Sequence, residues 1–267
     1  VLACLLVWGL TIAAAASTTD SSLAQSVDPK NTVVPGGIYR WTPPAGATDI
    51  RFNNRPVMRL QDQILVGIPL NHPLGAANLA YVLSGEDASH SFSVVDKAYT
   101  EQHITLQNRE MVNPNPEQLA RIRGESRRQR ALYLQHSDAP PPTAGFIQPL
   151  QGRISSLFGH RRFFNGQARN PHSGLDIAAP TGSEIRAPAA AEVTLVDDLY
   201  YNGKTIFLDH GQGLITMYCH LSESLVTEGE RVEQGEVIGL VGATGRVTGP
   251  HLHLSLIHIS EPTRPSV

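Results

Sequence analysis

Residues 229–245 read GERVEQGEVIGLVGATG, a run in which glycines separate short stretches rich in β-branched residues. This pattern is typical of short strands that are joined by tight turns. Similar short apolar runs precede it at residues 187–196, 205–209 and 214–219. The region from Gly145 onward is therefore predicted to form a small antiparallel sheet or a barrel-like domain.

The chain upstream of this region is also predicted to be rich in β-strands. Residues 99–106 (YTEQHITL) alternate as a strand does, and Pro-Pro, Gly-Gly and Ser-Gly pairs punctuate the segment around them. A helix is expected over residues 117–135, and the Pro-rich run DAPPPT at residues 138–143 follows it. The predicted fold class is mainly β, with a β-rich domain at 17–110, a helical and Pro-rich linker at 111–144, and an antiparallel-sheet domain at 145–254.

The composition is that of a globular protein, with 41% hydrophobic and 17% charged residues among 267. The net charge of −3 gives no sign of a polyanion-binding protein, so no nucleic-acid partner is expected. Residues 1–16 (VLACLLVWGLTIAAAA) form an apolar run that ends in small residues, which predicts a cleaved secretory signal peptide and an exported protein. The run is too short for a comfortable membrane span. A lipoprotein signal ending at Cys4 is the alternative.

Histidines concentrate in three short motifs of the second region: PHSGLD at 171–176, MYCHL at 217–221 and PHLHL at 250–254. A His-x-His pair on a strand places both imidazoles on one face, because side chains alternate with period two. His172 and Asp176 add one nitrogen and one oxygen ligand. Three protein ligands leave a fourth position open for water, which is the pattern of catalytic zinc. Other transition metals accept the same ligands, so zinc is favoured but not singled out.

Taken together, the motifs resemble the lysostaphin/LytM-type zinc endopeptidases. The matching stretches, in order, are GRISSLFGHRR at 152–162, PHSGLDIAAP at 171–180, DHGQGLITMYCHL at 209–221 and TGPHLHL at 248–254. The resemblance implies that zinc is held by His172, Asp176 and His253. It also implies that His220 and His251 are catalytic histidines beside the metal. Spacing alone leaves open which of His251 and His253 is the ligand.

The resemblance further implies an activity, a substrate and a location. The expected reaction is zinc-dependent hydrolysis of peptide cross-links in bacterial peptidoglycan, with His251 as general base and His220 orienting the water or stabilising the tetrahedral intermediate. We expect a monomer in the periplasm or cell envelope, without a stable membrane span in the mature chain. One alternative is a non-catalytic wall-binding module that activates another cell-wall hydrolase. Another is a zinc hydrolase that acts on an ester or a free peptide.

Two further features give expectations about packing. Residues 255–267 (SLIHISEPTRPSV) depart from the family pattern and resemble translated adapter sequence, so they are expected to be a non-native tail. Removing residues 256–267 is expected to leave the melting temperature unchanged. Cys219 stands next to His220, and strand alternation predicts that it faces away from the site as a small buried hydrophobe.

Overall fold

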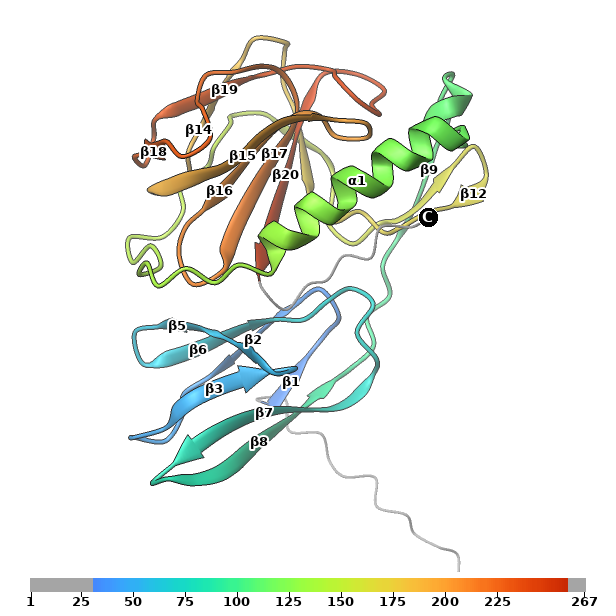
Figure 1. Ribbon diagram of the computed structural model, residues 1–267. Helices are drawn as coiled ribbons and strands as arrows, with labels where there is room; N and C mark the ends of the chain where they lie inside the picture. Colours follow the sequence, from blue (N-terminus) through green and yellow to red (C-terminus); the bar gives the residue numbers. More distant parts are fainter. Residues whose placement is uncertain (1–30, 259–267) are drawn as a thin grey trace, which may run out of the picture.

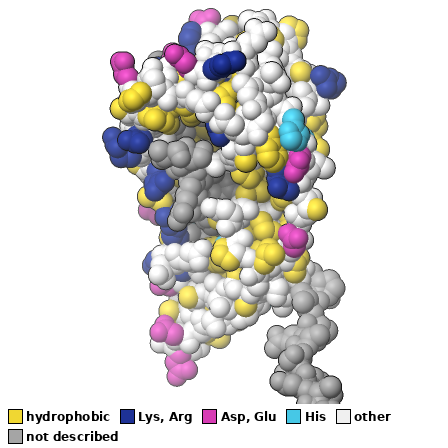
Figure 2. Space-filling view, turned by 90° about the vertical axis from the view of Figure 1, so that its right-hand side faces the viewer, with side chains coloured by type: hydrophobic (Ala, Val, Ile, Leu, Met, Phe, Trp, Pro, Cys, Tyr) yellow, Lys and Arg dark blue, Asp and Glu magenta, His cyan; other side chains and the backbone are white. Residues whose placement is uncertain are grey.

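The structure, a computed structural model, describes residues 31–258 and shows two β-rich units with one helix alongside the C-terminal unit (Figure 1). This confirms the mainly β fold class. The expected signal peptide lies outside the described residues, as does the part of the expected tail after His258. No helix within residues 31–258 is long and apolar enough to cross a membrane. Acidic and basic side chains are interspersed over the face drawn in Figure 2, as the small net charge predicts.

The N-terminal unit consists of two sheets around a shared apolar core. One sheet has the strand order β1-β8-β7-β3-β4 and the other β2-β6-β5. The strands are β1 (Thr32–Val33), β2 (Ile38–Trp41), β3 (Thr48–Phe52), β4 (Arg55–Pro56), β5 (Met58–Leu60), β6 (Gln63–Gly67), β7 (Gly75–Leu83) and β8 (Glu86–Val94). Alternate residues point into the core, among them the fully buried Ile64 and Leu79. Ser84 and Gly85 both have positive φ angles, as the tight turn between β7 and β8 requires.

The connecting segment contains strand β9 (Glu101–Ile104), the short 3-10 helix η2 (Arg109–Met111) and helix α1 (Pro116–Tyr133). Asn115 and Gln118 form a reciprocal capping box at the start of α1, and Pro116 occupies the first turn. The helix therefore begins one residue before the predicted start and ends two residues before the predicted end. Strand β9 pairs in parallel with β11 (Arg161–Phe164), so the connecting segment contributes a strand to the C-terminal unit.

The C-terminal unit is dominated by one large, mainly antiparallel sheet with the order β10-β13-β20-β17-β16-β15-β18, to which β14 and β19 add. Its strands are β10 (Arg153–Ser156), β13 (Leu175–Ala178), β14 (Glu184–Arg186), β15 (Ala191–Leu199), β16 (Gly203–Asp209), β17 (Leu214–Ser224), β18 (Arg231–Val232), β19 (Val237–Val241) and β20 (His251–His258). Strand β11 also pairs with β12 (Gln167–Ala168).

The two faces of this sheet carry different apolar clusters. Tyr218 and Leu252 belong to the main core on one face. Met217, Cys219 and Ile257 belong to a smaller cluster on the other face, where Tyr133 from α1 packs against them. The helix therefore covers part of the second face, and the rest of that face remains available for a functional site.

The last strand continues into the segment that was expected to be a non-native tail. Residues 255–258 pair with residues 214–217 of β17. Ile257 is 3% exposed and lies in the smaller apolar cluster. The origin of the tail stays a prediction, but this packing argues against the expectation that residues 256–258 are dispensable.

Two truncated chains, one ending after His258 and one after Leu254, test whether residues 255–258 contribute to stability separately from the residues that follow. A chain that ends after His258 is expected to melt at the same temperature as the full chain. A chain that ends after Leu254 loses four ladder positions and the buried Ile257 side chain, which costs about 2–5 kcal/mol and lowers the melting temperature by roughly 5–15 °C. Thermal unfolding followed by circular dichroism measures both. Equal melting temperatures for the two truncated chains would show that residues 255–258 of β20 do not stabilise the protein.

Candidate functional site

Two neighbouring strands and the loop before them bring three predicted ligands together. Asp176 on β13 lies directly opposite His253 on β20, so the two side chains share a face. His172 approaches from the loop that precedes β13. Its Nε2 lies 2.9 Å from Asp176 Oδ1 and 3.0 Å from His253 Nδ1, and His253 Nδ1 lies 2.8 Å from Asp176 Oδ1. All three residues are buried, and they are the one group of potential metal ligands found among the described residues.

The outer hydrogen bonds of the two imidazoles indicate which ring nitrogens carry the lone pairs. His172 Nδ1 lies 2.7 Å from the Leu157 carbonyl oxygen, which can only accept, so Nε2 carries the lone pair. His253 Nε2 lies 3.0 Å from Ser255 Oγ, and that hydroxyl donates to the Ser173 carbonyl. Ser255 therefore accepts from His253 Nε2, and Nδ1 carries the lone pair.

Two lone pairs and a carboxylate oxygen thus point at one buried position, and this donor set fits a divalent metal ion. Burial lowers the pKa of His253, which favours the neutral imidazole that binds a metal.

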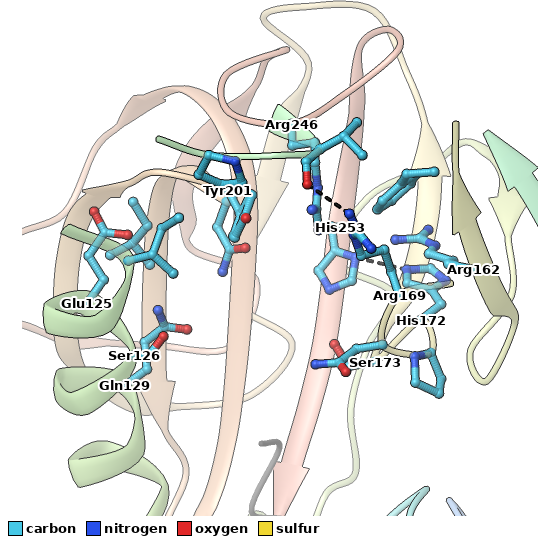
Figure 3. A pocket seen from close by; sticks show the side chains of 18 of the residues that line it. Glu125, Ser126, Gln129, Arg162, Arg169, His172, Ser173, Tyr201, Arg246 and His253 are labelled. Carbon is cyan, nitrogen blue, oxygen red and sulfur yellow. Dashed lines mark hydrogen bonds between the residues drawn. The ribbon is translucent and has the colours of Figure 1, made fainter. Parts of the chain in front are cut away.

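The second carboxylate oxygen of Asp176 is held by Arg162, which in turn contacts Gln102. The sequence motifs assign no role to either residue. Arg162 Nη2 donates to Asp176 Oδ2 at 2.7 Å, and Arg162 Nε donates to Gln102 Oε1 at 3.0 Å. Arg162 lies on β11 directly opposite Gln102 on β9. The arginine fixes the carboxylate so that Oδ1 faces the two imidazoles. Figure 3 shows Arg162 beside His172 and His253. Arg162 belongs to the GHRR stretch of the sequence, but only the pairing of β9 with β11 shows that Gln102 lies beside it.

Replacing Arg162 with alanine is expected to lower metal affinity about 10- to 100-fold, because partners of ligands typically contribute that much. Gln102→Ala should act in the same direction with a smaller effect, because Gln102 reaches the carboxylate only through Arg162. Affinity is measured by competition with a metal chelator of known strength. Arg161→Ala is the matched control, because the neighbouring side chain is exposed and pairs with Glu101 instead. Equal affinities for the Arg162 and Arg161 variants would contradict the supporting role.

His251 and His220 stand beside the three ligands. Their ring centroids are 4.8 Å apart, and His251 Nε2 is 3.9 Å from Asp176 Oδ1. Each Nδ1 donates to a backbone carbonyl, that of Gly249 for His251 and that of Thr244 for His220, at 2.9 Å in both cases. In the neutral form of each ring, Nε2 therefore carries the lone pair. Burial, together with the nearby His253 and His251, lowers the pKa of His220 to about 3, so this imidazole stays neutral at physiological pH.

The backbone conformation of His220 explains how its side chain reaches the sheet face that carries the three ligands. Its φ angle is +67°, in the left-handed region, and the pairing of β17 with β16 shifts register between Tyr218 and Leu221, on either side of it. The pairing of β17 with β19 shifts again just beyond, between Leu221 and Glu223. Such irregularities re-aim side chains and are common beside functional sites. Strict alternation would have sent His220 and Cys219 to opposite faces. Cys219 is a fully buried hydrophobe, as predicted, but it shares the site's face, and burial raises the pKa of its thiol.

The structure therefore brings all five predicted site residues together: His172, Asp176, His220, His251 and His253. Their distances and tautomers agree with the expected division into ligands and catalytic histidines, and that division itself stays a prediction.

Comparison with known proteins places this arrangement in context. The model of Peptidase family M23 matches residues 170–265. A crystal structure from Pseudomonas aeruginosa, described as a peptidase M23, superposes with a TM-score of 0.70 at 35% sequence identity, covering 86% of this chain and 92% of that one.

Among curated proteins, the Vibrio cholerae peptidoglycan DD-endopeptidase ShyA is 42% identical over 111 residues, which are 41% of this chain and 26% of the relative. The DD-carboxypeptidase/endopeptidase Mpg of Neisseria meningitidis serogroup B (strain MC58) is 42% identical over 120 residues, which are 45% of this chain and 28% of the relative. The matched segment thus spans about a quarter of the length of these two relatives.

Proposed function

This chain belongs to peptidase family M23, and on that premise we propose that it is a zinc-dependent endopeptidase that hydrolyses peptide cross-links of bacterial peptidoglycan. The observation that carries the proposal is the convergence of two imidazole lone pairs and one carboxylate oxygen beside two further histidines, His220 and His251. The peptidoglycan substrate is supported by the similarity to ShyA, a peptidoglycan DD-endopeptidase.

In the proposed mechanism, His172, Asp176 and His253 would hold the metal. A zinc ion held there would supply Lewis acidity, which polarises a carbonyl and lowers the pKa of a water molecule toward ~7. His251 Nε2 takes the proton from the attacking water and delivers it to the departing amine. His220 Nε2 accepts a hydrogen bond from that water and so orients it. Because His220 Nδ1–H is committed to the Thr244 carbonyl, this tautomer favours orientation of water over donation to an oxyanion.

Two alternatives remain distinct from this proposal. A non-catalytic module that activates another hydrolase has no need for three converging ligands with two histidines beside them. A zinc hydrolase of esters or free peptides would use the same site, so its distinction rests on the substrate. We further propose that the protein acts as a monomer in the periplasm or cell envelope, where peptidoglycan lies.

A digest of purified peptidoglycan tests the proposal and identifies the bond that is cut. The zinc-loaded protein should lower the fraction of cross-linked muropeptides, as read by mass spectrometry, and EDTA should abolish the effect until zinc is restored. A protein that binds zinc but leaves cross-links intact while hydrolysing casein or an ester would have another substrate. A protein that binds no zinc and releases nothing would instead favour the non-catalytic module.

A further inference from the structure

A cleft of about 700 Å³ adjoins the ligand cluster and extends beyond it. His172, His220 and His253 line one part of it, and residues of α1, including Glu125 and Gln129, line the opposite wall (Figure 3). A cleft of this size accommodates several residues of a peptide and not only the scissile bond. Its remaining walls therefore contact parts of the substrate that flank the reacting carbonyl.

Four arginines line this cleft: Arg130, Arg162, Arg169 and Arg246. Arg130 is exposed on α1, and of the other three, Arg169 and Arg246 have no carboxylate partner among the described residues. Arg162 is paired with Asp176. Arg169 donates to neutral acceptors, the Gln167 side chain at 2.6 Å and the Val112 carbonyl at 2.9 Å. In addition, Arg169 donates to the Ala168 carbonyl at 3.0 Å and to the Asn113 side chain at 3.4 Å.

Arg246 is less well satisfied than Arg169. Its guanidinium carbon lies 4.1 Å from the ring centre of Tyr201 and 4.5 Å from that of Phe164. Within residues 31–258, its one side-chain hydrogen bond is a long contact of 3.4 Å with the Met111 carbonyl. The aromatic contacts hold the guanidinium in place and leave most of its N–H groups without a strong acceptor.

The positive charge of Arg169 and Arg246 in this part of the cleft is not balanced by a carboxylate of the described residues. Burial and then the nearby Arg162 and Arg169 lower the pKa of Arg246 to about 10, although Tyr201 raises it. Glu125 on the opposite wall accepts from Arg121 Nε at 2.6 Å and from the Tyr200 amide at 2.9 Å, so both of its oxygens are occupied. An anion bound between Arg169 and Arg246 would supply the missing compensation.

We propose that Arg169 and Arg246 form a subsite that binds a free carboxylate of the substrate peptide beside the scissile bond. This inference rests on the proposed peptidase function. Guanidinium groups present planar, forked donors that match a carboxylate, and such charge-assisted bonds are about twice as strong as neutral ones. The subsite makes the enzyme selective for acidic peptides over peptides whose carboxylates are masked.

The test compares cross-linked muropeptide dimers that carry free carboxylates with the same dimers after conversion of those groups to carboxamides. The wild-type protein should cleave the free acids with a kcat/KM about 10- to 100-fold higher. Arg246→Gln and Arg169→Gln should lower that ratio toward one by slowing cleavage of the acids, with cleavage of the amides little changed. Arg246→Lys should retain part of the preference because it keeps the charge but not the fork.

Arg231→Gln is the control, because it removes one exposed arginine on β18 and should leave the ratio unchanged. Equal wild-type rates on acids and amides would overturn the subsite and leave the peptidase proposal standing. A variant that slows cleavage of both substrates equally would also overturn it, because this result assigns the arginines a structural role alone. Failure of the wild-type protein to cleave either dimer would instead count against the proposed function.

Discussion

Replacing His251 with alanine is expected to lower muropeptide turnover about 100- to 10,000-fold while leaving close to one equivalent of bound zinc. The reason is that His251 Nε2 approaches the ligand cluster but lies 3.9 Å from Asp176 Oδ1, outside the 2.8–3.0 Å contacts that join the three ligands. His220→Ala should also retain the metal. Zinc content by plasma mass spectrometry, measured beside turnover on the same samples, decides the outcome.

A control for this experiment is His103→Ala, which removes an exposed histidine on β9. It should change neither metal content nor turnover. A metal-free His251 variant together with a metal-retaining His253 variant would reverse the assigned roles. Full activity of His251→Ala would place the general base elsewhere.

The sequence predicted which side chains meet at the candidate site mainly because local periodicity controls their placement. His251 and His253 are two positions apart on one strand, so they face the same side wherever that strand pairs. His172 and Asp176 lie close together in the chain, and Asp176 needed only the pairing of β13 with β20 to meet His253. The placement of these side chains therefore does not depend on exact prediction of the strand boundaries.

Features that depend on irregular backbone or on distant pairing could not be predicted in this way. His220 reaches the site through a left-handed backbone conformation, which alternation does not anticipate. Gln102 lies upstream of the predicted linker and meets Arg162 only because β9 pairs with β11. Arg246 lies in a loop whose aromatic neighbours, Tyr201 and Phe164, come from distant segments. In each case, the position of the side chain depends on irregular backbone or on contacts between segments that are distant in the sequence, and local periodicity does not predict these.

Replacing any one of the three ligands is expected to remove both metal and activity. If zinc binding contributes about 10–16 kcal/mol, as in structural zinc sites, the loss of one ligand of three costs roughly 3–5 kcal/mol, or on the order of 10²- to 10⁴-fold in affinity. His172→Ala, Asp176→Ala and His253→Ala should therefore lose zinc on dialysis, and turnover should fall with it. Metal content and turnover are measured as for His251→Ala.

Thermal unfolding with and without EDTA links these variants to stability. The wild-type protein should melt at a lower temperature in EDTA, because a ligand that binds only the folded state stabilises it. His253→Ala should melt at the same temperature in both conditions, since it has no metal to lose. Asp176→Ala should be the least stable of the three, because it also leaves Arg162, whose side chain is 17% exposed, without its carboxylate. Retention of metal and turnover by all three variants would place the metal site elsewhere in the chain.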